Sequence, residues 1–159
     1  VLEDYMVKDT RTNLSRVCGK GVPGAKLARL HYTVAADGQS FFSPEYTPSL
    51  SANGRTELDI RLETGRHHQI RVQLSHMGCP IVGDTKYDPN CSSLGSSWQN
   101  ICLCAYRLEF CHPKTRELFG SVCDASGQSN PAIQRCSRQP PSMHGWPGQR
   151  VIALIASRK

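Results

Sequence analysis

The sequence lacks any apolar stretch close to the roughly 20 residues that a membrane-spanning helix needs. Its first ten residues, VLEDYMVKDT, contain acids and no apolar core, so they do not resemble a secretory signal. The chain also begins without Met, which suggests a piece of a longer protein. With 38% hydrophobic and 20% charged residues in 159 positions, we expect one globular domain in the cytoplasm or an organelle, with no membrane partner.

Paired cysteine motifs are also lacking. The chain has eight cysteines, but none form the CxxC pairs of a zinc ribbon. Cys102, Cys104 and Cys111 beside His112 could suggest a metal cluster. However, Cys102 and Cys104 lie in an apolar strand pattern, where free cysteine behaves as a small hydrophobic residue. We therefore expect no metal, and we expect reduced thiols.

A strongly basic body is lacking as well, although the net charge is +6. Residues 124–159 hold five lysines and arginines against one acid, whereas residues 1–123 hold fourteen against twelve. Gly, Ser, Pro, Gln and Arg dominate residues 124–159, and the apolar run 151–155 has no partner nearby in sequence. We expect a folded part over 1–123 followed by a basic, mostly disordered tail over 124–159.

Alternation of apolar and polar residues predicts the β-strands. The predicted strands cover 26–34, 56–63, 102–110 and 118–122, with a turn at 112–116 joining the last two. Glycine, proline, serine and asparagine predict irregular chain over 1–24, 35–55 and 88–100.

A short helix is predicted directly after the strand at 56–63. Thr64 offers an N-cap, and Ile70, Leu74 and Met77 recur at helical spacing. Gly78 supplies a C-terminal stop.

Basic and polar residues crowd the first turns of this predicted helix, in the order Gly65, Arg66, His67, His68, Gln69, Ile70 and Arg71. A helix N-terminus presents free N–H groups and a partial positive charge, which favour an anion such as a phosphate or a carboxylate. His67 and Arg71 are four residues apart and are expected to share a face. The residues alone leave open a solvated helix start, although basic side chains there oppose the helix dipole.

The segment TGRHHQIRVQLSHMGCPIVGDTKYD, residues 64–88, is similar to the TGRxHQIR…GxPIxGDxKY segment of RluA-type RNA pseudouridine synthases. The flanking blocks DYMVKD, TNLSRV, PGAKLARLHYTV and ICLCAYRLEFCHPKTRELF also resemble that family, in the same order, over residues 2–122. The resemblance implies an α+β fold, with a mixed, mostly antiparallel sheet and peripheral helices. Residues 1–123 would supply its C-terminal half.

The resemblance also implies an activity, the isomerisation of uridine to pseudouridine in rRNA or tRNA, without a metal or organic cofactor. In the family an Asp acts on the sugar, and the Arg that ends the HQIR block holds that Asp ionised, as a neighbouring opposite charge should. That role falls on Arg71 here. Gly65, Arg66, His67, His68 and Gln69 become candidates for RNA contact, whereas Gly83 and Asp84 match a pair with an expected structural role.

One departure from the family pattern limits this expectation. The HRLDxxTSG block with the nucleophilic Asp and the K-x-Y block with the pocket Tyr do not occur in this sequence. Three hypotheses follow. The chain is the C-terminal half of a synthase, inactive without a missing N-terminal half that carries HRLD; it is a non-catalytic RNA-binding protein that keeps the RNA-facing helix; or it is a fragment whose open sheet edge prevents stable folding.

Overall fold

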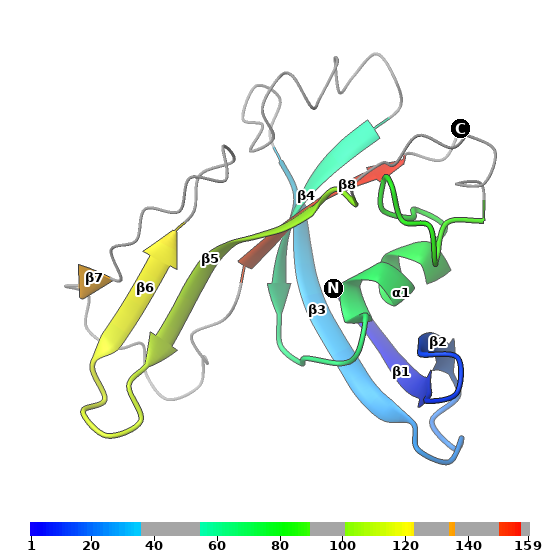
Figure 1. The fold of residues 1–159 in the computed structure, drawn as a ribbon, viewed down its shortest axis with the longest axis horizontal. Coiled ribbons are helices and arrows are strands. Elements are labelled where there is room, and N and C mark those ends of the chain that lie inside the picture. The colour runs from blue at the N-terminus through cyan, green and yellow to red at the C-terminus, as the bar shows by residue number, and fades with distance from the viewer. Residues whose placement is uncertain (36–54, 90–100, 123–133, 136–149, 157–159) are drawn as a thin grey trace.

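The computed structural model describes residues 1–35, 55–89, 101–122, 134–135 and 150–156 (Figure 1). They form one eight-stranded sheet, in the order β2-β1-β3-β4-β8-β5-β6-β7, and one α-helix. The strand pairings in this part of the chain are all antiparallel. This architecture confirms the α+β class and the mostly antiparallel sheet. The irregular connections expected at 36–54 and 90–100 lie outside the described residues.

Two of the predicted strands form the centre of the sheet. β3 (Lys26–Val34) matches its prediction, and β4 (Arg55–Leu62) is shifted by one residue. They pair with Leu30 opposite Leu62. Helix α1 (Gln69–His76) covers one face of this part of the sheet. Alternating residues of the two strands therefore pack against the helix, and the buried core cluster consists of Leu30, Leu58, Ile60, Ile70, Leu74 and Ile81.

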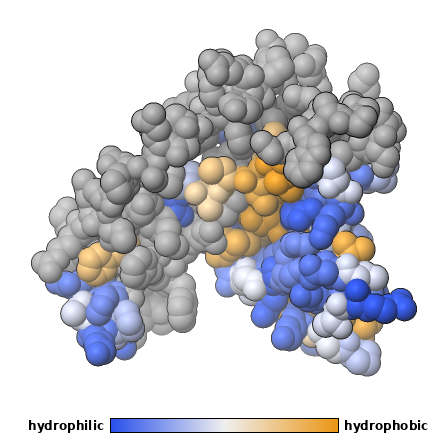
Figure 2. Space-filling view, in the orientation of Figure 1, coloured by the Kyte–Doolittle hydropathy of each residue, from blue (hydrophilic) through white to orange (hydrophobic). Residues whose placement is uncertain are grey.

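Surface polarity follows the same arrangement. Figure 2 shows apolar residues gathered in the middle of the molecule, while the surface beside β1 and β2 is mainly hydrophilic. Partly buried apolar side chains that border the core include Leu2, Tyr32, Leu62, Met77 and Cys79. The described residues contain no helix long and apolar enough for a membrane crossing.

The N-terminal region is more regular than expected. β1 (Leu2–Asp9) pairs with β2 (Leu14–Cys18) on one side and with β3 on the other. The prediction of irregular chain over 1–24 is therefore wrong for these residues. Within the sequence LEDYMVKD only Met6 is buried. Backbone hydrogen bonds, rather than an apolar face, therefore define this strand.

The end of α1 confirms the predicted stop at Gly78. Gly78 has φ of 84°, its N–H donates to Ser75 O at 2.9 Å, and the Cys79 N–H donates to Leu74 O at 3.0 Å. These two bonds form a Schellman motif, in which a left-handed residue lets the chain turn back over the last helical turn. Cys79 packs against the core cluster that contains Leu74.

The predicted hairpin near the C-terminus is also present. β5 (Leu103–Cys111) pairs with β6 (Leu118–Val122), and the His112 imidazole accepts the N–H groups of Lys114 and Thr115 in the turn between them. The register of β5 shifts between Ala105 and Arg107. Cys102 is half-buried, but Cys104 is exposed, so it is not the buried hydrophobic residue that we expected.

The C-terminal region contradicts the expected disordered tail in two places. β8 (Arg150–Ala156) lies between β4 and β5 and pairs with both, and β7 (Gln134–Arg135) pairs with β6. An unbroken apolar run is typical of a strand inside a sheet, but its partners here lie far away in sequence. Local patterning could not reveal them. The division of the chain at residue 123 stays a prediction.

β8 joins two groups of strands, because β4 and β5 pair with β8 rather than with each other. Replacing Ala153, which lies opposite Leu58 and Leu103, by Pro removes a backbone donor from the middle of the sheet. We expect Ala153→Pro to lower the free energy of unfolding by on the order of 3 kcal/mol. Urea unfolding followed by circular dichroism would measure this, with Ala153→Ser as the control that keeps the N–H. An unchanged midpoint would contradict the placement of β8.

Candidate functional site

The site begins with a tight turn between β4 and α1. His68 has φ of 54° and ψ of 26°, and α1 starts at the next residue, Gln69. The Arg66 carbonyl accepts the Gln69 N–H at 3.1 Å, and the His68 carbonyl accepts the Val72 N–H at 3.0 Å. Thr64 is therefore not the N-cap, and residues 65–68 precede the helix instead of forming its first turn. The expectation that His67 and Arg71 share a helical face is wrong for this reason.

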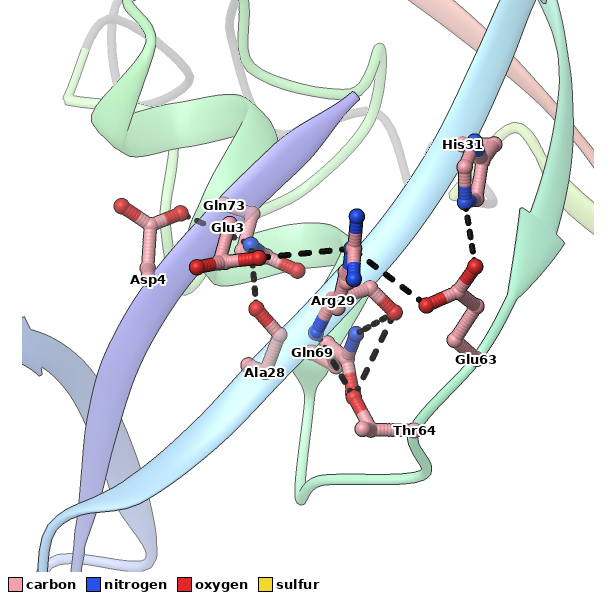
Figure 3. A network of polar contacts seen from close by, with 9 residues as sticks. All are labelled: Glu3, Asp4, Ala28, Arg29, His31, Glu63, Thr64, Gln69 and Gln73. Atoms are coloured by element: carbon pink, nitrogen blue, oxygen red, sulfur yellow. Dashed lines mark hydrogen bonds and ion pairs between the residues drawn. The ribbon is translucent and has the colours of Figure 1, made fainter.

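Gln69 holds this turn against the sheet (Figure 3). Its side-chain oxygen accepts the Thr64 hydroxyl at 2.8 Å and the Arg66 N–H at 2.9 Å, while its nitrogen donates to Arg29 O at 3.1 Å. Thr64 in turn accepts the Arg29 N–H at 2.8 Å. Gln69 is 3% exposed. Its oxygen and its nitrogen are both engaged with protein, which indicates a structural role rather than direct contact with a ligand.

A second glutamine of α1 forms hydrogen bonds with β1 and β3. Gln73, one helical turn further on, donates to Asp4 Oδ2 at 2.7 Å and to Ala28 O at 3.3 Å. Figure 3 shows Gln69 and Gln73 reaching from the helix toward β1 and β3. The start of α1 is thereby fixed relative to the sheet.

The Arg66 side chain bonds to the sheet at one edge, and the residue remains partly exposed. Its Nε donates to Leu27 O on β3 at 2.7 Å, so one edge of the guanidinium is anchored to backbone. The residue as a whole is half-buried. Gly65, directly before it, is exposed, and an added Cβ there would meet nothing within 4 Å. No close backbone approach therefore requires a glycine at this position.

Arg71 forms a paired ionic contact with Asp84. Arg71 Nε donates to Asp84 Oδ2 at 2.9 Å, and Nη2 donates to Oδ1 at 2.6 Å. The Asp84 side chain is fully buried, whereas the Arg71 side chain is 19% exposed. Burial alone would raise the pKa of Asp84, but the hydrogen bonds from Arg71 and from the Lys86 and Tyr87 N–H groups outweigh it and lower that pKa.

Tyr87 contacts several other residues of the site. Its hydroxyl accepts the Ser15 N–H at 3.0 Å and lies 2.8 Å from His68 Nδ1. Its ring lies 5.0 Å from the Arg71 guanidinium carbon and edge-on to His68. The Tyr87 carbonyl accepts the Ser75 hydroxyl at 2.5 Å. The loop after α1 is therefore tied to both the helix and β2.

The two histidines lie against each other, with ring centroids 3.8 Å apart. Burial, followed by the charges of His67 and Arg71, lowers the pKa of His68 to about 4. Burial, followed by the charges of Lys8, Lys86 and Arg71, also lowers the pKa of His67, whose Nδ1 lies 2.9 Å from the Ser15 hydroxyl. Both imidazoles are therefore neutral at pH 7. The permanent positive charge that faces Asp84 is carried by Arg71.

The structure thus brings His67, His68 and Arg71 together with three residues that were not predicted as site members. Ser15, Asp84 and Tyr87 complete the cluster. Asp84 and Tyr87 fall in the GDTKY part of the motif, which was a usable signal. Ser15 lies in a region that we expected to be irregular, so no sequence pattern pointed to it.

The arrangement is suited to hydrogen bonding with an anion and to contact with flat rings. Arg71 retains donors on its exposed side, and His67 offers a half-exposed neutral ring beside it. In the described part of the chain, no three His, Cys, Asp or Glu side chains are placed to hold a metal ion. The absence of a metal from the reaction stays an expectation.

Comparison with known proteins finds one matching family model. The model of the family described as RNA pseudouridylate synthase matches residues 2–76, which include β1 to β4, the turn and Arg71. Over this segment the chain is similar to RNA pseudouridine synthases. No solved structure matches the chain.

Curated relatives of this segment come from several bacteria. An uncharacterized RNA pseudouridine synthase, YjbO of Bacillus subtilis, is 38% identical over 85 residues, covering 54% of this chain and 28% of the relative. A Chloroflexus aurantiacus synthase is 52% identical over 58 residues, covering 36% and 18%. Ribosomal large subunit pseudouridine synthase D of Xanthomonas campestris is 36% identical over 100 residues, covering 56% and 30%. The matched segment thus spans less than a third of each of these synthases.

The depressed pKa of His68 gives a testable pH dependence. The unfolded residue binds its proton near pH 6.5 and the folded one only near pH 4. The contribution of neutral His68 to the free energy of unfolding is therefore fully present above pH 6.5 and is lost as the pH falls through about 4. We expect an NMR titration to show His68 with a midpoint near pH 4, and His68→Asn to flatten the fall of stability between pH 6.5 and 4. His76→Asn, at an exposed position, is the control. A midpoint for His68 near 6.5 would contradict the burial described.

The role of Gln69 can be tested separately from ligand binding. Gln69→Leu leaves the Arg66 N–H without its partner and removes one bond of the Thr64 hydroxyl. The Arg29 carbonyl keeps the N–H groups of Glu63 and Thr64. Unpaired buried groups cost about 1–3 kcal/mol, so we expect the free energy of unfolding to fall by that amount. Denaturant unfolding would measure it, with exposed His76→Leu on the same helix as the control. If Gln69→Leu is as stable as the wild type, Gln69 is not the structural fastener of the turn.

Proposed function

We propose that this chain supplies the C-terminal part of an RNA pseudouridine synthase catalytic domain, and that Arg71 holds the nucleophilic Asp of a segment outside these 159 residues. The observation that carries the proposal is Arg71 itself. It lies within the family match, at a fixed position, with donors on its exposed side. A carboxylate beside this guanidinium would stay ionised, as its role in the reaction requires.

The reaction is an isomerisation. The C1′–N1 glycosidic bond of uridine breaks, the uracil turns, and C1′ bonds to C5. C5 gives up its hydrogen to solvent, and the freed N1 takes up a proton. The Asp acts on the sugar, and the target nucleotide must leave the helical stack to be reached. Since this sequence lacks the HRLD block, the chain by itself holds the partner of the nucleophile but not the nucleophile.

For RNA contact we propose a smaller group than the sequence suggested. Gln69 is buried among protein groups, and the Nε edge of Arg66 is anchored to β3. His67 and the free donors of Arg66 and Arg71 are better placed to meet a phosphate or a base, with Gly65 and His68 shaping the turn. We further propose rRNA or tRNA as the substrate, the cytoplasm or an organelle as the location, and a contribution to RNA affinity from the basic residues of 124–159.

Tritium release from RNA labelled at C5 of uridine tests this proposal. We expect no release by the chain alone, and release when a polypeptide carrying the HRLD block of a synthase is added. Arg71→Ala should then reduce the rate at least about a hundredfold, because the nucleophile loses its ionic partner. Arg61→Ala, at an exposed position of β4, is the matched control and should not change the rate.

Two other results would lead elsewhere. Clear release by the chain alone, unaffected by substitution of any of its Asp residues, would contradict the mechanism. RNA binding that depends on Arg66 and Arg71 but never yields release would favour the alternative, a non-catalytic RNA-binding protein.

A further inference from the structure

We propose that Asp84 is a positioning residue that determines which edge of Arg71 is offered to a ligand. This inference rests on the proposed function of the same site. It gives Asp84 a role beyond stabilising the fold, and it specifies how an oxyanion must approach. The oxyanion has the chemistry shared by an RNA phosphate and a nucleophilic carboxylate, which both accept two parallel N–H bonds from a guanidinium.

The first step is the count of donors on Arg71. A guanidinium carries five N–H groups in one plane. Asp84 takes one from Nε and one from Nη2, at 2.9 and 2.6 Å, and so occupies the lateral edge of the fork. The two N–H groups of Nη1 and the second of Nη2 remain. One from each nitrogen points along the end of the side chain, and the other N–H of Nη1 points to the Cδ side.

The second step is that Asp84 cannot follow Arg71 if Arg71 moves. Its carboxylate is fully buried, and Oδ1 also accepts the N–H groups of Lys86 at 3.0 Å and Tyr87 at 3.1 Å. The Asp84 N–H donates to Ile81 O at 3.1 Å. A buried carboxylate whose Oδ1 is held by two backbone N–H groups defines the direction of the guanidinium that it binds.

The Arg71 guanidinium also lies over the ring of Tyr87. The Tyr87 ring centroid is 5.0 Å from the Arg71 guanidinium carbon, within the range of a cation–π contact. Asp84 thus holds one edge of the guanidinium and the Tyr87 ring lies beside it, which leaves the end edge with two adjacent donors. An incoming oxyanion would be bound end-on and in the plane of the guanidinium.

If Asp84 positions Arg71, removing the Asp84 charge changes RNA affinity in the opposite direction to that expected from net charge alone. Removing a negative charge near an RNA site should strengthen RNA binding if only net charge matters. If Asp84 positions Arg71, removing its charge should weaken binding, although the site becomes more positive. The sign of the change therefore separates the two explanations.

The experiment is a double-mutant cycle on the full 159-residue chain, with Asp84→Asn, Arg71→Ala and both together. One arm measures affinity for a single-stranded, uridine-containing RNA oligonucleotide, and the other measures affinity for the polypeptide carrying the HRLD block. We expect Asp84→Asn to weaken binding roughly 3- to 30-fold in the arm whose oxyanion uses Arg71, and to have no further effect once Arg71 is Ala. Asp9→Asn, which changes the charge equally in an exposed turn, is the control and should leave affinity equal or slightly higher.

A second variant covers the case in which Asp84→Asn does not fold, since removing one partner of a buried ion pair can be strongly destabilising. Arg71→Lys keeps a positive charge opposite Asp84 but has no second edge to present. If Asp84 pairs with the lysine ammonium as it pairs with the guanidinium, Arg71→Lys should bind the RNA or the polypeptide as weakly as Arg71→Ala. Binding by Arg71→Lys close to the wild-type level would overturn the proposal.

The results also distinguish this inference from the proposed function. If Arg71→Ala has no effect in either arm, the proposed role of Arg71 fails and Asp84 has nothing to position. If Arg71→Ala weakens binding but Asp84→Asn leaves it unchanged or strengthens it, Arg71 acts without Asp84 and only the present inference is overturned.

Discussion

The fully buried carboxylate of Asp84 is the constraint around which the candidate site is arranged. A buried carboxylate is costly unless it is paired and hydrogen-bonded, and here Arg71 and two backbone N–H groups satisfy it. Because these donors come from α1 and from the loop after it, one charge fixes the position of two separate segments. The tyrosine that follows, Tyr87, extends the same order to His68 and to β2.

The strained residue of the turn fits this arrangement. His68 is a non-glycine residue in the left-handed region, a conformation that costs roughly 1–3 kcal/mol and needs support from its surroundings. Support comes from both sides, since Gln69 ties the turn to β3 and the Tyr87 hydroxyl contacts the His68 ring. The turn before α1 is thus held by both the sheet and the loop after the helix.

Sequence patterns predicted those elements whose own residues alternate in polarity or carry a glycine stop. β3, β4, the β5–β6 hairpin and the helix stop at Gly78 follow from alternation and from glycine chemistry. β1 was missed because its sequence does not alternate, and β8 because its partners lie about fifty and ninety residues away. Pairing between distant segments is a property of the whole sheet, and no local window contains it.

The candidate site shows the same division between residue identity and geometry. The motif resemblance selected Arg71 and its neighbours, but a motif does not tell which side chains are turned inward. Gln69 was expected at the RNA and is buried, whereas Asp84 was expected to be merely structural and contacts Arg71 directly. The difference arises because residues that support a site and residues that touch a ligand occur together in such a motif. An arginine with one edge bound inside the protein and another left exposed can serve both purposes.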